Sequence, residues 1–279
     1  MRGAWLVLGL SAIAVVFTLL RAQTRLTRRY TPALSVLPAA VSGDAVRGEH
    51  LSYTYGCRHC HGEDLGGAVM SDDVLMRVVA PNITPGSPLV QVYRLQDWQR
   101  AIWHGVARDG RPLLIMPSDH LRGLSDADLT ALTSHLTTAP SVERELPPTE
   151  VRVLGRILLG SGAPLLAAET IDHTRPRPPL AAPAPNVSVA YGAYVARTCE
   201  GCHGIDHRGG PPVGPPGTPA PPDISSAALR QWTQGEFVRA LREGKKRDGS
   251  ALDEMMPWQS FKHLTDDELE ALWMAMTHG

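Results

Sequence analysis

Two copies of a Cys-x-x-Cys-His motif constrain this chain more than any other feature of its sequence. They are Cys57-Arg58-His59-Cys60-His61 and Cys199-Glu200-Gly201-Cys202-His203, and together they use all four cysteines of the 279 residues. Two thiols about one helical turn apart can add to the two vinyl groups along one edge of a porphyrin, and the next histidine then faces the iron. The motifs therefore predict two covalently bound haem c groups, with His61 and His203 as iron ligands.

Three other chemistries also use paired cysteines. A thioredoxin-like redox pair lies in a βαβ context, which this sequence lacks, and it needs no adjacent histidine. A zinc site would gather thiolates from two distant places in the chain and would leave both histidines unexplained. A disulfide framework needs a shorter chain that is denser in cysteine. We therefore interpret both motifs as haem-attachment sites.

The sequence that follows each motif is also repeated. Each copy contains a Pro-Asn/Asp-Ile-Thr/Ser sequence, a segment that begins with an acid and ends in glycine, an Asp-Gly turn, a Met-Pro pair and a Leu-Ser/Thr-Asp sequence. These features begin at Pro81, Asp97, Asp109, Met116 and Leu124 in the first copy and at Pro222, Glu236, Asp248, Met256 and Leu264 in the second. The chain divides accordingly into an N-terminal segment (residues 1–30), a first repeat (43–140), a proline-rich connector (141–187) and a second repeat (188–279).

Each repeat ends in a predicted helix that can cover one face of a porphyrin. Ser125 with Asp128, and Thr265 with Glu268, have the spacing of N-cap and N3 residues in capping boxes. Behind these pairs an apolar stripe recurs at i, i+3 and i+7, formed by Leu129, Leu132 and Leu136 in the first repeat and by Leu269, Leu272 and Met276 in the second. One such stripe per repeat covers one haem face.

The duplication also selects a sixth iron ligand. Of eight methionines, only Met116 and Met256 occupy equivalent positions, each before a proline. A thioether is a soft, neutral ligand that favours ferrous iron and closes the coordination sphere, so it favours electron transfer over oxygen or peroxide chemistry. Met255 competes with its neighbour for this role, and His120 and His263, shortly after the two Met-Pro pairs, are alternative ligands.

This order of motifs resembles the class I cytochrome c domain, over residues 43–140 and 188–279. It is most similar to the tandem diheme cytochromes related to the cytochrome subunits of membrane-bound alcohol and gluconate dehydrogenases. The resemblance implies an all-α fold of two tandem domains, each wrapped around one covalent haem. It further implies that Pro81 and Pro222 offer their carbonyls to the axial histidines and that Trp98 lies against the haem edge, where Phe237 replaces it in the second repeat. Those dehydrogenase subunits typically carry three such domains, whereas this chain has two.

The N-terminal segment is predicted to be a signal anchor or a signal peptide. Residues 4–20 contain no charge and lie between Arg2 and a group of arginines that starts at Arg21. No Ala-x-Ala cleavage site follows, which favours an uncleaved hydrophobic helix that attaches the chain to the membrane. The positive-inside rule argues for a cytoplasmic location. The resemblance implies haem attachment on the other side, so we expect the repeats on the periplasmic side of the bacterial inner membrane, or exported to the periplasm if the signal is cleaved.

The expected function is the transfer of single electrons between redox protein partners, from a donor such as a dehydrogenase or a quinol-linked complex to an acceptor outside the cytoplasm. A fixed cytochrome subunit of a larger membrane oxidoreductase is the alternative, and a diheme peroxidase is less favoured because the paired methionines close both irons. The formal net charge of −1 lacks the basic stripe that nucleic-acid binding needs. We expect the connector to wrap along both haem domains, and the proline cluster at residues 211–222 to form a rigid lid or a docking surface.

Overall fold

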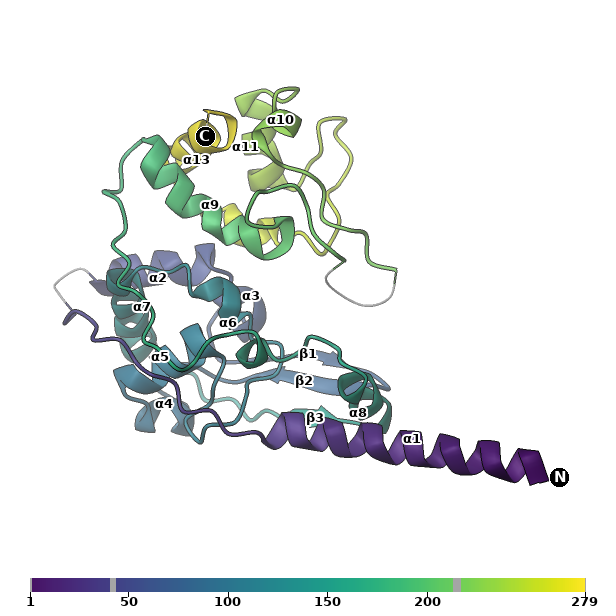
Figure 1. The fold of residues 1–279 in the computed structure, drawn as a ribbon. Helices are drawn as coiled ribbons and strands as arrows, with labels where there is room; N and C mark the ends of the chain where they lie inside the picture. Colours follow the sequence, from purple (N-terminus) through teal and green to yellow (C-terminus); the bar gives the residue numbers. More distant parts are fainter. Residues whose placement is uncertain (1, 41–43, 213–216, 279) are drawn as a thin grey trace.

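The structure is a computed structural model that describes residues 2–40, 44–212 and 217–278, and it is mostly helical (Figure 1). The N-terminal helix α1 spans Arg2–Thr27. The first repeat contains α2 (Asp44–Thr54), α3 (Cys57–His61), α4 (Pro88–Val92), α5 (Leu95–His104), α6 (Ser118–Leu121) and α7 (Asp126–Thr138). The connector contains α8 (Val153–Gly160) and a 3₁₀ turn (Ala167–Glu169). The second repeat contains α9 (Val189–His203), α10 (Ser226–Leu229), α11 (Gln234–Glu243), α12 (Trp258–Phe261) and α13 (Asp266–His278). The expected start of the first repeat at residue 43, part of the second proline cluster (213–216) and residue 279 lie outside the described residues.

The expectation of an all-α fold is wrong in one place. Strands β1 (Ala68–Asp72), β2 (Met76–Ala80) and β3 (Glu150–Val151) form an antiparallel sheet in that order. The hairpin occupies the stretch between the first haem motif and Pro81, and alternate residues of β2 are buried. Its third strand comes from the connector, where Val151 pairs with Met76. A two-residue strand that pairs at this distance along the chain leaves no local pattern for sequence analysis to detect.

Each repeat has its own hydrophobic core, built on one pair of crossed helices. In the first repeat α2 crosses α7 at Gly48, where a Cβ atom would clash with the carbonyl oxygen of Ala131. In the second repeat α9 crosses α13 at Gly192, where a Cβ atom would clash with the carbonyl oxygen of Ala271. The predicted apolar stripes of both final helices are buried in these cores. The same packing is therefore built twice.

The two predicted capping boxes have different outcomes. In the second repeat the Thr265 N–H donates to the Glu268 carboxylate at 2.8 Å, and the Glu268 N–H donates to the Thr265 hydroxyl at 3.1 Å. In the first repeat the Asp128 N–H donates to the Ser125 hydroxyl at 3.0 Å, but the Ser125 N–H donates instead to the hydroxyl of Tyr194 at 2.9 Å. The aspartate is one methylene shorter than glutamate, and a residue of the second repeat completes the cap. The prediction of a self-contained box in the first repeat is wrong.

The connector lies mainly against the first repeat. The Asn82 side-chain amide donates to the Val142 carbonyl at 2.6 Å, and the Arg144 guanidinium pairs with Asp64 at 2.7 Å. Towards its end the connector turns to the second core, against which Leu180 and Ala182 pack. The connector thus contacts both repeats.

Helix α1 is held at its C-terminal end and extends from the body of the molecule at the other end (Figure 1). Ala22 packs against Leu159 and Leu166 of the connector, and the Arg25 guanidinium donates to the Glu169 carboxylate. Within the part of the chain that the structure describes, no helix is long and apolar enough to cross a membrane.

Candidate functional sites

The two Cys-x-x-Cys-His motifs lie on short helical turns. In the first repeat Gly56, with φ of 73°, separates α2 from the turn α3 that carries the motif. In the second repeat the motif forms the last turn of the continuous helix α9. Helical geometry places the two cysteines of each motif about one turn apart, as predicted. Both motifs therefore present the residues that haem attachment requires.

The histidine of each motif makes the same hydrogen bond. Nδ1–H of His61 donates to the carbonyl oxygen of Pro81 at 2.7 Å, and Nδ1–H of His203 donates to that of Pro222 at 2.8 Å. Burial lowers the pKa of both imidazoles, and the hydrogen bond to proline opposes this only in part. A neutral imidazole that donates through Nδ1 has its lone pair on Nε2, which is the form that ligates iron.

The loop that follows each histidine is the same in both repeats. Gly67 N–H donates to the His61 carbonyl at 2.7 Å, and Gly209 N–H donates to the His203 carbonyl at 2.8 Å. Leu65 and His207, four residues after the respective histidine, both have left-handed φ values, of 60° and 58°. Such a conformation is uncommon for residues with a side chain, so its recurrence marks a loop whose shape is set by its surroundings.

The two Met-Pro pairs also share a local geometry. Pro117 and Pro257 have nearly the same φ and ψ, and each precedes a single helical turn, α6 or α12. The side chains of Met116 and Met256 are partly buried and pack against the first and the second core, respectively. Met255 is 47% exposed, so the packing favours its neighbour Met256 as the ligand.

The two alternative histidine ligands lie at the contact between the repeats. The ring of His263 stacks on that of Tyr53 with 4.1 Å between ring centroids. His120 lies beside Gly201 of the second motif. Both imidazoles thus contact residues of the opposite repeat, a role that the sequence did not suggest.

Trp98 is buried on α5, and its indole N–H has no hydrogen-bond acceptor among the described residues. Its ring contacts the edge of Tyr93. A buried donor without a partner is costly, so this site fits a bound group that carries acceptor oxygens, as the carboxylates of haem do. In the second repeat Phe237 is buried at the equivalent place and contacts Trp273, so no such donor is present there.

Burial disfavours the thiolate form of the first cysteine of each motif. Burial raises the pKa of the Cys57 thiol to about 12 and that of Cys199 to about 11. Metal ligation requires the thiolate, which these surroundings disfavour. Among the residues that the structure describes, no group of three or more histidine, cysteine or acidic side chains is placed to hold a metal ion, so the structure lends no support to a zinc site.

Each repeat thus combines a mainly helical fold with a Cys-x-x-Cys-His motif and a Met-Pro pair, as the class I cytochrome c domain does. A family model described as cytochrome c oxidase, cbb3-type, subunit III matches residues 188–274. The chain therefore contains a cytochrome c domain in its second repeat. A covalently bound haem c supplies a one-electron couple, and the domain has an electron-transfer role.

The chain is related to the cytochrome subunits of several dehydrogenases. It is 36% identical over 101 residues to the cytochrome c subunit of alcohol dehydrogenase (quinone) from Gluconacetobacter polyoxogenes, which covers 33% of this chain and 22% of that protein. It is 31% identical over 120 residues to the fructose dehydrogenase cytochrome subunit of Gluconobacter japonicus, covering 39% of this chain and 25% of that protein. It is 28% identical over 102 residues to the gluconate 2-dehydrogenase cytochrome c subunit of Pantoea cypripedii, covering 33% and 23%. The chain thus spans about a quarter of the length of these relatives.

Proposed function

We propose that this chain is a diheme c-type cytochrome that passes single electrons between a donor and an acceptor outside the cytoplasm. Cys57 and Cys60 hold one haem, and Cys199 and Cys202 hold the other. The axial pairs are His61 with Met116 and His203 with Met256. The observation that carries the proposal is the contact of each axial histidine with a proline carbonyl, at 2.7 Å and 2.8 Å, because this contact is made in both repeats.

The chain's own residues orient and shield the iron ligands in this proposal. The carbonyls of Pro81 and Pro222 fix the ring orientation and the tautomer of the two imidazoles and make them stronger ligands. Met116 and Met256 would each supply a thioether to the iron, a soft ligand that raises the reduction potential. The buried indole N–H of Trp98 supplies a hydrogen-bond donor in the first repeat alone.

The haem count tests the proposal most directly. Intact-mass measurement of the purified protein should show two haem additions per chain. The paired substitutions Cys57→Ala/Cys60→Ala and Cys199→Ala/Cys202→Ala should each remove one haem and retain the other. A native protein that carries a single haem would contradict the diheme assignment.

The methionine ligands are tested by redox titration with reduced-minus-oxidised spectra. Met116→Ala and Met256→Ala should each lower the potential of one haem, because a ligand that favours ferrous iron is lost. Met255→Ala is the matched control, and it should leave both potentials unchanged. If the native protein binds carbon monoxide readily at either iron, that site is open and the peroxidase alternative gains support there.

A fixed subunit of a larger oxidoreductase is the second candidate function, and the names of the relatives favour it. Attachment to the periplasmic side of the membrane through the N-terminal helix is part of the same proposal. Exposed apolar side chains on α1, such as Ile13, Phe17 and Leu20, support it. The full chain should stay with membranes through a high-salt wash, and copurification of a dehydrogenase would identify it as a subunit. Recovery in the soluble fraction would contradict membrane attachment.

A further inference from the structure

Two carboxylates occupy the same position in the two repeats and are both withdrawn from solvent. Asp128 and Glu268 are the N3 residues of the final helices α7 and α13, and their side chains are 1% and 10% exposed. A buried carboxylate is costly unless it is paired and hydrogen-bonded. The groups that pair with these two carboxylates therefore contribute to the stability of the contact between the repeats.

Asp128 has one partner in each repeat. The Arg47 guanidinium, on α2 of the same repeat, donates to Oδ2 at 2.9 Å. The Tyr194 hydroxyl, on α9 of the second repeat, donates to the same oxygen at 2.5 Å and accepts the Ser125 N–H. The carboxylate thus joins the first helix of its own repeat to the first helix of the other.

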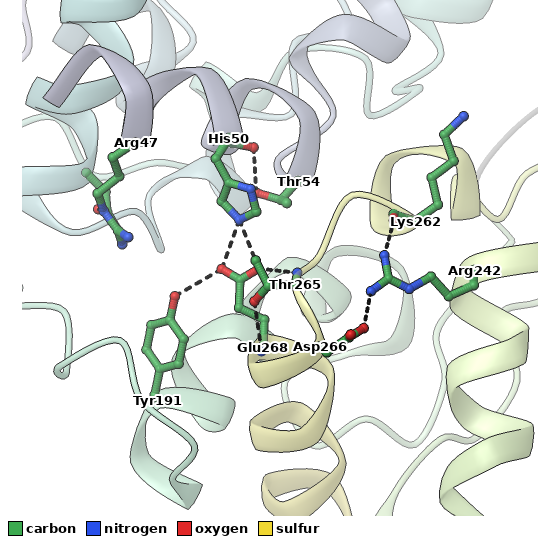
Figure 2. A network of polar contacts seen from close by, with 10 residues as sticks. Arg47, His50, Thr54, Tyr191, Arg242, Lys262, Thr265, Asp266 and Glu268 are labelled. Carbon is green, nitrogen blue, oxygen red and sulfur yellow. Dashed lines mark hydrogen bonds and ion pairs between the residues drawn. The ribbon is translucent and has the colours of Figure 1, made fainter. Parts of the chain in front are cut away.

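Glu268 is bound in the same manner with the repeats exchanged (Figure 2). The Tyr191 hydroxyl, on α9 of the same repeat, donates to Oε1 at 3.0 Å. Nε2 of His50, on α2 of the first repeat, lies 2.9 Å from both carboxylate oxygens and donates to them. Burial tends to raise the pKa of Glu268, but the hydrogen bonds from His50 and from the Thr265 N–H outweigh it, and the pKa lies below its usual value.

The two sets of contacts are equivalent by position. Gly48 and Gly192 make the same helix crossing in the two repeats. Arg47 and Tyr191 each precede that glycine by one residue, and His50 and Tyr194 each follow it by two. Each repeat therefore binds the carboxylate of the other with the residue at the same position. The subunits of a twofold dimer make contacts of this kind across an isologous interface.

The same interface brings the haem-attachment motifs into contact with the opposite repeat. Gly201 of the second motif lies against the ring of His120 on α6, which follows Met116. Gly56, just before the first motif, lies near Ser260 of α12, which follows Met256. Each motif thus contacts the segment next to the proposed methionine ligand of the other repeat.

We propose that His50 and Tyr194 are positioning residues that lock the two repeats together through Glu268 and Asp128 and thereby hold the two haem-attachment motifs at a fixed separation for electron exchange. This inference rests on the proposed diheme function. Tyr191 and Arg47 bind the same carboxylates from within their own repeats, and their side chains also face each other across the interface.

The structure offers a matched control for this proposal. Tyr194→Phe removes a hydroxyl that binds the carboxylate of the other repeat, whereas Tyr191→Phe removes one from the same helix whose carboxylate partner lies in its own repeat. His50→Phe, combined with Tyr194→Phe, removes both crossing contacts and leaves the rings to fill the space. The hydrogen bonds lost are to charged groups, so each one should favour the separated arrangement by about tenfold or more.

The experiment measures three quantities on the haem-loaded full chain. Intact mass gives the haem count, amide hydrogen exchange at α6 and α12 reports opening of the interface, and pulsed reduction reports the rate of electron exchange between the haems. The double variant should show about hundredfold faster amide exchange and slower electron exchange, with the absorption spectrum of each haem unchanged. Tyr191→Phe keeps the contacts of His50 and Tyr194 with the carboxylates, so it should change both rates less.

The outcomes separate this inference from the function on which it rests. If the double variant carries two haems and both rates equal those of the native protein, His50 and Tyr194 do not position the repeats and the inference is wrong. Equal effects of Tyr191→Phe and Tyr194→Phe would also overturn it, because general helix support would then explain the result. A native protein with one haem contradicts the proposed function itself.

Discussion

The two repeats have the same local geometry around their histidines and methionines but are reinforced in different ways. The first is covered by the connector and carries two strands of a three-stranded sheet, and α1 packs on the connector in turn. The second has no sheet among its described residues. Side chains of its own residues occupy places that the connector occupies in the first repeat. At the end of α5, Gly105 lies beside the backbone of Ala168 from the connector, whereas at the end of α11 the equivalent Gly244 lies beside the indole ring of Trp258.

This difference separates the features common to both proposed haem sites from those that the surrounding chain adds to one of them. The features present in both repeats are the helix crossing, the histidine-to-proline hydrogen bond, the left-handed loop residue and the Met-Pro turn. The features of one repeat alone attach it to the rest of the molecule. Substitutions at matched positions of the two repeats, and at the contact between them, test this separation.

The largest effect is expected at the two helix crossings. Gly48→Ala and Gly192→Ala place a methyl group against the backbone of the crossing helix, which should cost about 1–3 kcal/mol and exceed the gain of up to about 1 kcal/mol in helix propensity. Because each repeat has its own core, each substitution should first destabilise its own repeat. Chemical denaturation followed by hydrogen exchange measures this. Gly235→Ala, on α11 with nothing near its Cβ, is the control and should not destabilise. Equal destabilisation of both repeats by Gly48→Ala would show that they unfold as one unit.

An effect of the same order, confined to the haem-loaded protein, is expected where the repeats differ, at Trp98 and Phe237. Trp98→Phe makes the first repeat resemble the second and removes the buried indole N–H. If that group binds a carboxylate of haem, the haem-loaded protein should lose about 1.5–3 kcal/mol of stability, and the potential of the first haem should change. Thermal unfolding and redox titration measure the two effects. A potential that stays at the native value would exclude a hydrogen bond from this indole to the haem.

The smallest effect is expected from pH, at the contact between the repeats. The pKa of Glu268 is lowered in the folded protein, where His50, Tyr191 and the Thr265 N–H face its carboxylate and Arg47 lies next to Tyr191. A lowered carboxyl pKa stabilises the fold above the unfolded value of about 4.5, and this stabilisation is lost as the pH falls through the lower folded value. Amide exchange at α12 should therefore accelerate below about pH 4.5, and Glu268→Gln should weaken this dependence. An unchanged acid response in Glu268→Gln would assign it to other groups.

Much of each site was predictable from short stretches of sequence. The spacing of the Cys-x-x-Cys-His motif, the Met-Pro pairs and the i, i+3, i+7 stripes depend on residues within a few positions of one another, and the periodicity of a helix fixes how these lie. Repetition strengthened the inference, because Met256 was selected over Met255 by its match to Met116. The buried stripes and the packing of Met256 agree with these predictions.

The rest required contacts between residues far apart in the chain. The amino-acid sequence by itself determined two haem-attachment motifs, their candidate ligands and mainly helical repeats, because these are properties of local spacing. Only the tertiary structure decided that β3 of the connector completes a sheet, that Tyr194 completes the cap of α7 and that His50 meets Glu268. No local pattern records these pairings, because the residues that meet lie far apart in the chain and, for His50 and Tyr194, on helices of different repeats.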